Sequence, residues 1–187
     1  CPPEWGCIRA ARNRRVPADG GTIGDSSIVA KLTDIVAPGA IVASLKSSER
    51  DAIIVELVDS LIASGAVAPA VRDELVARVL ERERRGSTGF GKGVAVPHVK
   101  HKSITRMHAA VGLSQRGVDF RALDNQPVYS VFLLVSPEDS PEEHLHAMEV
   151  IFKNLSKDTF RRFLRQATTV EEVKTLLEEA DGQHLAA

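Results

Sequence analysis

Residues 82–100 read Arg-Glu-Arg-Arg-Gly-Ser-Thr-Gly-Phe-Gly-Lys-Gly-Val-Ala-Val-Pro-His-Val-Lys. A charged helix end meets Gly86, four glycines fall from Gly86 to Gly93, and the apolar run 94–96 leads to Pro97-His98. The pattern predicts a histidine at the end of a strand, beside a loop whose backbone can close around a small group. Because imidazole is nucleophilic near neutral pH and a glycine-rich loop among cations suits an anion, this stretch predicts a histidine that carries a phosphoryl group.

Two helices are expected ahead of this stretch. The run Ile41–Leu45 is strand-like, and Ser47 or Ser48 can cap a helix that starts at Glu49 and ends before Gly65. Its apolar stripe is formed by Ile53, Ile54, Leu57, Val58, Leu61 and Ile62. Pro69 opens a second helix that Gly86 ends, which places Arg82 in the last turn, against the loop.

Strands and further helices follow the stretch. Strands are expected at Val94–Val96, Met107–Leu113 and Val128–Val135, and the last should be central because it is apolar almost throughout. Helices are expected from Ser140 to Leu155, from an Asp158 cap to Arg165, and from a Thr169/Glu172 capping box to Gly182. Helices before and after a strand cluster indicate an α/β fold, a layered domain with a mixed sheet.

Length and composition limit the classes of function. A chain of 187 residues suits one domain and buries roughly 70% of its extended surface without disulfides. With 24 Lys+Arg against 25 Asp+Glu there is no basic excess for nucleic acid, and no apolar stretch is long enough to enter a membrane. Both cysteines, Cys1 and Cys7, lie at the N-terminus, and a globular part without cysteine fits a reducing cytoplasm.

The N-terminal region differs from the rest in composition. Residues 1–30 mix Pro, Gly, Arg and small polar residues without an apolar period, and we expect a flexible arm there. The phosphocarrier domain is expected over residues 31–182, with a C-terminal tail over 183–187. Cys1 fits either a lipoprotein's modified residue or a fragment that lacks its Met, and we expect the fragment.

Several short motifs have competing interpretations. Residues 86–93 resemble a Walker A loop, but Gly93 replaces the Ser/Thr that would bind magnesium, and a P-loop joins strand to helix whereas this loop joins helix to strand. The histidines at 98, 101, 108, 144 and 146 have no cysteine or carboxylate at zinc-ligand spacing, so no metal site is expected. His101, His108 and His184 are expected at the surface or at strand ends.

The order of residues from Glu83 to His98 resembles a known family. Glu83, then Phe90-Gly91, then Val94–Val96 and Pro97-His98 are similar to the active-site signature of the fructose/mannitol-type enzyme IIA domains of the bacterial phosphoenolpyruvate-dependent sugar phosphotransferase system, nitrogen-regulatory relatives included. The resemblance extends from about residue 31 to about residue 180. Val99 departs from it, because the family usually has a small residue after the histidine.

The resemblance implies a layered α/β/α domain, with a mixed sheet flanked by helices on both faces. It also implies a cytoplasmic protein-histidine phosphotransferase component without cofactor. His98 would accept a phosphoryl group from the phosphohistidine of HPr or a paralogue and pass it to a cysteine of an enzyme IIB partner in sugar uptake. The family has an arginine at the place of Arg82, while Ser87 and Thr88 can donate hydrogen bonds to phosphate oxygens from beside the glycines. The alternative is a regulatory module whose phosphorylation state decides its binding to a transporter or kinase.

A second histidine is expected beside His98. At ~100° per residue, Leu145, Met148, Ile151, Phe152 and Leu155 share one helix stripe, His144 lies on its edge and His146 points away. Only His144 can then face the sheet and His98. The resembled family has a histidine at this helix position, where it hydrogen-bonds the phosphoryl group; the competing interpretation is a histidine of the helix's first, capping turn.

Overall fold

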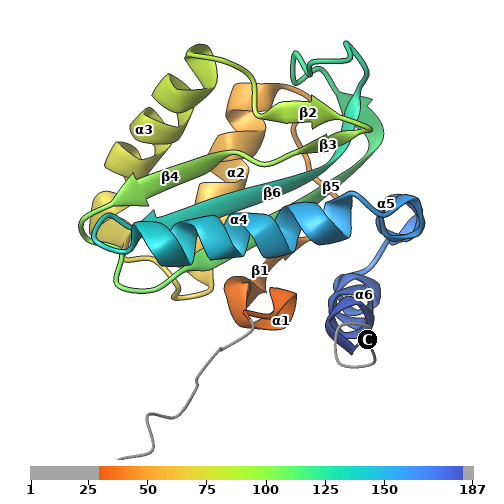
Figure 1. The fold of residues 1–187 in the computed structure, drawn as a ribbon. Coiled ribbons are helices and arrows are strands. Elements are labelled where there is room, and N and C mark those ends of the chain that lie inside the picture. The colour runs from red at the N-terminus through yellow and green to blue at the C-terminus, as the bar shows by residue number, and fades with distance from the viewer. Residues whose placement is uncertain (1–29, 183–187) are drawn as a thin grey trace, which may run out of the picture.

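The computed structural model describes residues 30–182, which form one sheet between two layers of helices (Figure 1). The sheet has six strands: β1 (Val36–Val42), β2 (Gly89–Gly91), β3 (Val94–Ala95), β4 (His98–His101), β5 (His108–Val118) and β6 (Val128–Pro137). Its order is β1-β5-β6-β3-β2, and β4 also pairs with β6. Since β6 runs antiparallel to β5 but parallel to β3 and β4, the sheet is mixed and β6 is central, as predicted.

Helices cover both faces of the sheet, which confirms the α/β/α prediction. The helices α2 (Arg50–Ala63) and α3 (Arg72–Arg84) pack against one face, and the 3-10 turn Pro69–Val71 joins them. The helices α1 (Leu32–Ile35), α4 (Pro141–Leu155), α5 (Asp158–Gln166) and α6 (Val170–Gly182) lie on the other face. Alternate β6 residues therefore serve two separate cores, with Leu133 in the first and Leu134 in the second.

The first long helix, α2, follows its predicted apolar stripe but not its predicted cap. Ile53, Ile54, Leu57, Val58 and Leu61 are buried, and Gly65 turns the chain with φ +77° just after the helix. However, Glu49 is the N-cap residue and no side chain caps the helix. The carboxylate of Glu56 instead accepts the amides of Lys46 and Ser47, so the two serines lie in a turn that is tied to the helix flank.

The strand containing the signature histidine is divided differently from the prediction. The expected strand Val94–Val96 forms only its first two residues as β3, and the chain resumes pairing with β6 as β4, whose first residue is His98. The prediction that His98 ends a strand was therefore wrong. The amide of Leu134 donates to the Pro97 carbonyl (2.9 Å), which holds the proline between the two short strands against β6.

Other elements also begin or end at residues that differ from the prediction. β1 begins at Val36 rather than Ile41, and β5 continues beyond Leu113 because Val118 pairs with Val128 after a register shift. Lys157, not Asp158, is the N-cap residue of α5, whereas the Thr169/Glu172 capping box is present in both directions (3.1 and 3.2 Å).

The short helix α1 was not predicted, and one carboxylate fastens it. Asp181 near the end of α6 accepts the Leu32 amide (2.8 Å) and both the amide and hydroxyl of Thr33 (3.0 and 2.7 Å). The first and last described segments therefore lie side by side. The predicted arm, apart from residue 30, and the predicted tail lie outside the described residues.

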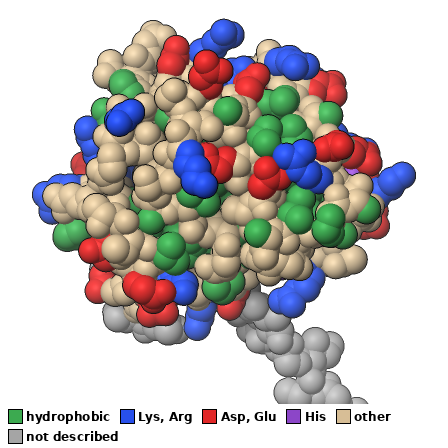
Figure 2. All heavy atoms as spheres, turned by 180° about the vertical axis from the view of Figure 1, so that it is seen from behind, with side chains coloured by type: hydrophobic (Ala, Val, Ile, Leu, Met, Phe, Trp, Pro, Cys, Tyr) green, Lys and Arg blue, Asp and Glu red, His purple; other side chains and the backbone are tan. Residues whose placement is uncertain are grey.

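The surface turned away in Figure 1 carries acidic and basic side chains in alternation, without a large region of one sign (Figure 2). This agrees with a formal net charge of −1. Within residues 30–182, every helix is too short or too polar to cross a lipid bilayer.

Candidate active site

Two histidines from distant parts of the chain meet at the edge of the sheet. His98 pairs with Leu134, whose side chain belongs to the core under α4, so His98 faces α4. His144 lies in the first turn of α4 and is buried. Their ring centroids are 5.6 Å apart with 52° between the ring planes. A group bonded to one ring can therefore contact the other.

A backbone carbonyl fixes the tautomer of His98. Its Nδ1 lies 3.0 Å from the Val96 carbonyl oxygen, and a carbonyl only accepts hydrogen bonds, so Nδ1 carries the proton and donates it. In a neutral imidazole the other nitrogen then holds the lone pair. Nε2 of His98 is therefore the ring nitrogen whose lone pair is free.

His144 is held neutral and oriented by its surroundings. Burial, the positive charge of Lys100 and the neighbouring His98 lower the pKa of His144 to about 4. The hydroxyl of Ser136 lies 2.8 Å from His144 Nδ1 and 3.3 Å from the Val99 carbonyl. The hydroxyl has one proton, and only the shorter contact is within the usual O–H···X range. Ser136 therefore donates to Nδ1, which leaves the N–H of His144 on Nε2.

Lys100 and Ser136 are site residues that the sequence analysis missed. Lys100 shares the α4 face with His98 because the two residues alternate along β4, a period-2 signal that was present in the sequence. Ser136 follows the apolar run of β6 and is completely buried. No sequence pattern connects Ser136 with His144, because only the packing of α4 on the sheet brings them together.

The helix phase of α4 was predicted correctly for the histidines and wrongly for Leu145. His144, Ala147, Val150, Ile151 and Leu155 are buried, while Leu145 is 68% exposed. The buried stripe is thus rotated toward His144 relative to the predicted one. His146 points outward, and its Nε2 accepts the amide of Ala30 (3.3 Å). Only His144 of the pair contacts His98, as predicted.

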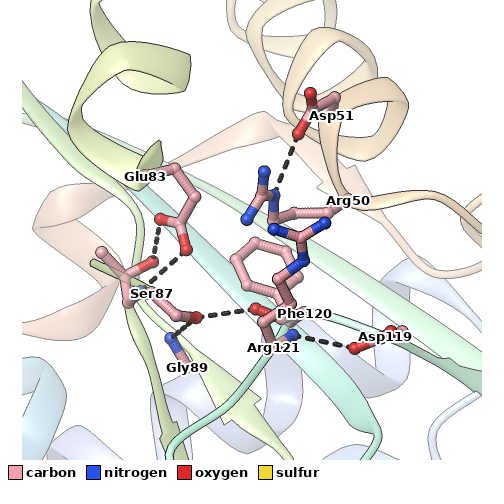
Figure 3. A network of polar contacts seen from close by, with 9 residues as sticks. Arg50, Asp51, Glu83, Ser87, Gly89, Asp119, Phe120 and Arg121 are labelled. Carbon is pink, nitrogen blue, oxygen red and sulfur yellow. Dashed lines mark hydrogen bonds and ion pairs between the residues drawn. The ribbon is translucent and has the colours of Figure 1, made fainter. Parts of the chain in front are cut away.

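The glycine-rich loop is tied to helix α3 by a buried carboxylate. Glu83 accepts the Thr88 amide (2.8 Å) and the Thr88 hydroxyl (2.7 Å), and Ser87 Oγ donates to the Phe120 carbonyl (2.7 Å). Figure 3 shows Glu83 turned toward the loop and Ser87 between Phe120 and Gly89. Both hydroxyl protons are therefore in use within the protein. These bonds do not support the prediction that Ser87 and Thr88 donate to phosphate.

Arg82 lies in the last turn of α3, as predicted, but on the other side of the sheet from His144. Its Nη1 donates to the Gly86 carbonyl (2.9 Å). Arg78, one turn earlier, reaches the Lys100 carbonyl in β4 (3.3 Å). Because α3 runs antiparallel to β4, Arg82 lies further toward the His98 end of this edge strand, and its guanidinium can approach the site only around the sheet edge.

His101, expected at the surface or a strand end, is at the end of β4 but completely buried. Its Nδ1 accepts the Ser103 amide (3.0 Å), so the proton is on Nε2, which lies 3.1 Å from a carboxylate oxygen of Glu74 without hydrogen-bond geometry. His101 thus joins β4 to α3 on the face opposite His98. Within residues 30–182 no group of three His, Cys, Asp or Glu side chains could hold a metal ion. His184 lies outside the described residues.

Comparison with known proteins gives one family. A family model described as "Phosphoenolpyruvate-dependent sugar phosphotransferase system, EIIA 2" matches residues 34–180. A nitrogen regulatory protein of Bradyrhizobium diazoefficiens is 33% identical over 147 residues, 78% of this chain and 94% of that protein. The fructose-specific EIIABC component of Bacillus subtilis is 30% identical over 81% of this chain, which spans only 24% of that protein.

Solved structures share the fold. The nitrogen regulatory protein IIA-Ntr of Neisseria meningitidis matches with a TM-score of 0.69 and 27% identity, covering 77% of this chain and 97% of that one. Escherichia coli enzyme IIA mannitol, solved in complex with phosphorylated enzyme IIB mannitol, matches with a TM-score of 0.64 and 22% identity, covering 75% and 95%. At that identity the second match shows the fold alone.

The Glu83 contact leads to a stability prediction. Glu83→Gln keeps the shape of the side chain but removes its charge and leaves one acceptor oxygen for the two Thr88 donors, and we expect the free energy of unfolding to fall by about 1.5–3 kcal/mol. Urea denaturation measures this. The exposed Glu81, paired with Arg85, provides the matched control, and Glu81→Gln should cost at most about 0.5 kcal/mol. Similar losses in both variants would contradict the assigned role of Glu83.

The Ser136 contact leads to a spectroscopic prediction. In the parent protein at pH 7, ¹⁵N imidazole shifts should show His144 with the proton on Nε2 and an unprotonated, hydrogen-bonded Nδ1. Ser136→Ala removes the donor and should raise the population with the proton on Nδ1, while Ser136→Thr should keep the parent tautomer. A parent spectrum with the proton on Nδ1 would show that Ser136 donates to Val99 instead.

Proposed function

The chain belongs to the EIIA type-2 family of the phosphoenolpyruvate-dependent sugar phosphotransferase system, and from this premise we propose that it is a phosphocarrier that carries its phosphoryl group on Nε2 of His98. The observation that supports this assignment is the tautomer of His98. Its Nδ1–H is bound to the Val96 carbonyl, so the lone pair of Nε2 is free for phosphorus. The neighbouring His144 supplies an N–H at the same edge of the sheet.

The proposed transfer moves no proton at His98. The Nε2 lone pair attacks phosphorus on a donor phosphohistidine, a P–N bond forms, and the old P–N bond breaks with its electrons returning to the donor nitrogen. In onward transfer a cysteine thiolate of the acceptor attacks phosphorus in line. A P–S bond forms, and the P–N bond breaks with its electrons returning to Nε2 of His98. Catalysis is then mainly positioning and charge neutralisation, which the fixed ring orientation favours.

The charges near His98 suit a phosphoryl group. Lys100 lies on the same face of β4, and its field already acts on His144. Neutral His144 already carries its proton on Nε2, so it would donate a hydrogen bond to a phosphoryl dianion without being protonated first. Arg82 can add a guanidinium if it leaves the Gly86 carbonyl and turns around the sheet edge. Ser87 and Thr88 then shape the loop rather than bind the phosphoryl group directly.

We propose phospho-HPr or a paralogue as donor and an enzyme IIB protein as acceptor in sugar uptake. The family match and the similarity to a fructose-specific EIIABC component support this choice. A regulatory role is the second candidate, in which the phosphorylation state of His98 decides binding to a transporter or kinase. It is favoured by the similarity to nitrogen regulatory proteins, one of which is 33% identical over 147 residues. Phosphoryl transfer to a IIB cysteine distinguishes the two.

The first functional test is labelling. Incubation with phosphoenolpyruvate, enzyme I and HPr should give an acid-labile phosphohistidine, and NMR of the product should place the phosphorus on Nε2 of His98. His98→Gln should abolish the label, while His101→Gln should still accept it if folded, because His101 faces the other core. Label that persists in His98→Gln would refute the assignment.

The second functional test compares the two neighbouring histidines of α4. A hydrogen bond to a charged group contributes about 1.5–3 kcal/mol, so His144→Ala should slow onward phosphoryl transfer by roughly 10- to 150-fold. His146→Ala is the matched control and should transfer at the parent rate, because His146 points away from His98. A larger loss in His146→Ala would exclude the proposed role of His144.

A further inference from the structure

A separate cavity of about 410 Å³ lies beside α5, where β3 and β6 begin. Val94, Pro127 and Tyr129 form its apolar wall. It is distinct from the histidine site: Val94 pairs with Ser130, whereas His98 pairs with Leu134, four residues further along β6 and about 13 Å away. The loop residue Lys92, part of the glycine-rich stretch, lines this cavity.

The charged lining of the cavity has an excess of cations. The cationic side chains that line it are Lys92, Arg161, Arg162 and Arg165. The carboxylates that line it are those of Asp124 and Asp158, so two positive charges are uncompensated. Asp158 pairs with Arg161, and Asp124 accepts the backbone amides of Lys92 and Gln126. Among the contacts of residues 30–182, the side chains of Lys92, Arg162 and Arg165 have neither an ion pair nor a hydrogen bond.

The cations are held in place without consuming their donors. The Arg165 guanidinium lies 3.6 Å from the centre of the Tyr129 ring, which fixes its plane and leaves its N–H edges free. Lys92 has a left-handed φ of +60° between Gly91 and Gly93, and its amide is fixed by Asp124 (2.9 Å), so the turn keeps Lys92 at the cavity wall.

The spacing of the arginines lowers the stability of helix α5. Arg165 lies one turn from both Arg161 and Arg162, and like charges at this spacing destabilise a helix. A bound anion would remove that repulsion. The pattern of repelling, oriented and unpaired cations therefore points to a ligand rather than to fold stability.

We propose that this cavity binds a small phosphate monoester. Such a group carries nearly two negative charges at pH 7, which matches the uncompensated charge of the lining. Planar guanidinium edges bind phosphate oxygens in pairs, and the apolar wall can contact a short carbon skeleton. The volume lies within the range of small-molecule sites. The ligand is bound and not transformed, so the site is independent of His98.

Titration followed by amide NMR tests the proposal on the full chain. Glycerol 3-phosphate, added at constant ionic strength in chloride, should give saturable shifts at residues 92–94 and 129–130, and glycerol alone should give none. Loss of a charged hydrogen bond predicts at least about 10-fold weaker binding in Arg165→Gln. Arg84→Gln removes an exposed arginine outside the cavity and should change the dissociation constant less than about twofold.

Three outcomes would overturn the proposal: shifts that do not saturate, equal weakening in Arg84→Gln, or binding that disappears in His98→Gln. The last would place the ligand at the histidine site. Arg165→Gln also removes the stacking on Tyr129, so Lys92→Gln serves as a second variant that leaves α5 unchanged and should also weaken binding. Failure of phosphocarrier activity would leave this result untouched, because the titration needs no phosphoryl transfer.

Discussion

The pairing of residues 94–101 along β6 is the constraint on which the site depends. The chain pairs as β3, passes Val96-Pro97, and pairs again as β4 in the same direction. In the gap the Val96 amide donates to the Thr88 carbonyl and the Pro97 carbonyl accepts from Leu134, so the Val96 carbonyl is free to accept Nδ1–H of His98. An interruption of two residues in a strand thereby selects which imidazole nitrogen can act as a nucleophile.

The two histidines differ because their surroundings differ. His98 is half-buried at the start of an edge strand and is bound at Nδ1 by a carbonyl, which keeps Nε2 as a lone-pair atom. Burial, the positive charge of Lys100 and the neighbouring His98 lower the pKa of His144, and the hydroxyl of Ser136 keeps its proton on Nε2. One ring can therefore form a bond to phosphorus while the other donates a hydrogen bond, without any proton moving between them.

The two halves of the glycine-rich stretch contact different parts of the molecule, and the sequence alone does not distinguish them. Its first half is bound to α3 through Glu83 and Thr88 and to the carbonyl of Phe120, just after β5, through Ser87; these contacts lie directly before β2 begins at Gly89. Its second half, at Lys92, turns toward the cationic residues of α5 instead of toward His98. Glycines in this loop thus act as backbone turns between two regions, and Lys92 belongs to the cavity for which we propose phosphate binding.

The sequence by itself determined most of the periodic elements, the layered α/β architecture with a mixed sheet and the central strand, because apolar period and strand alternation are local properties of the chain. The proximity of His98 and His144 was predicted from the helix phase together with the resemblance to the family. Only the tertiary structure decided the rest. The roles of Ser136, Lys100 and Asp181 depend on contacts between segments far apart in the chain. The division of the histidine strand, the partners of Ser87 and Thr88, and the exposure of Leu145 were likewise set by how β6 and the helices pack, since local propensity does not specify which groups a neighbouring element will offer.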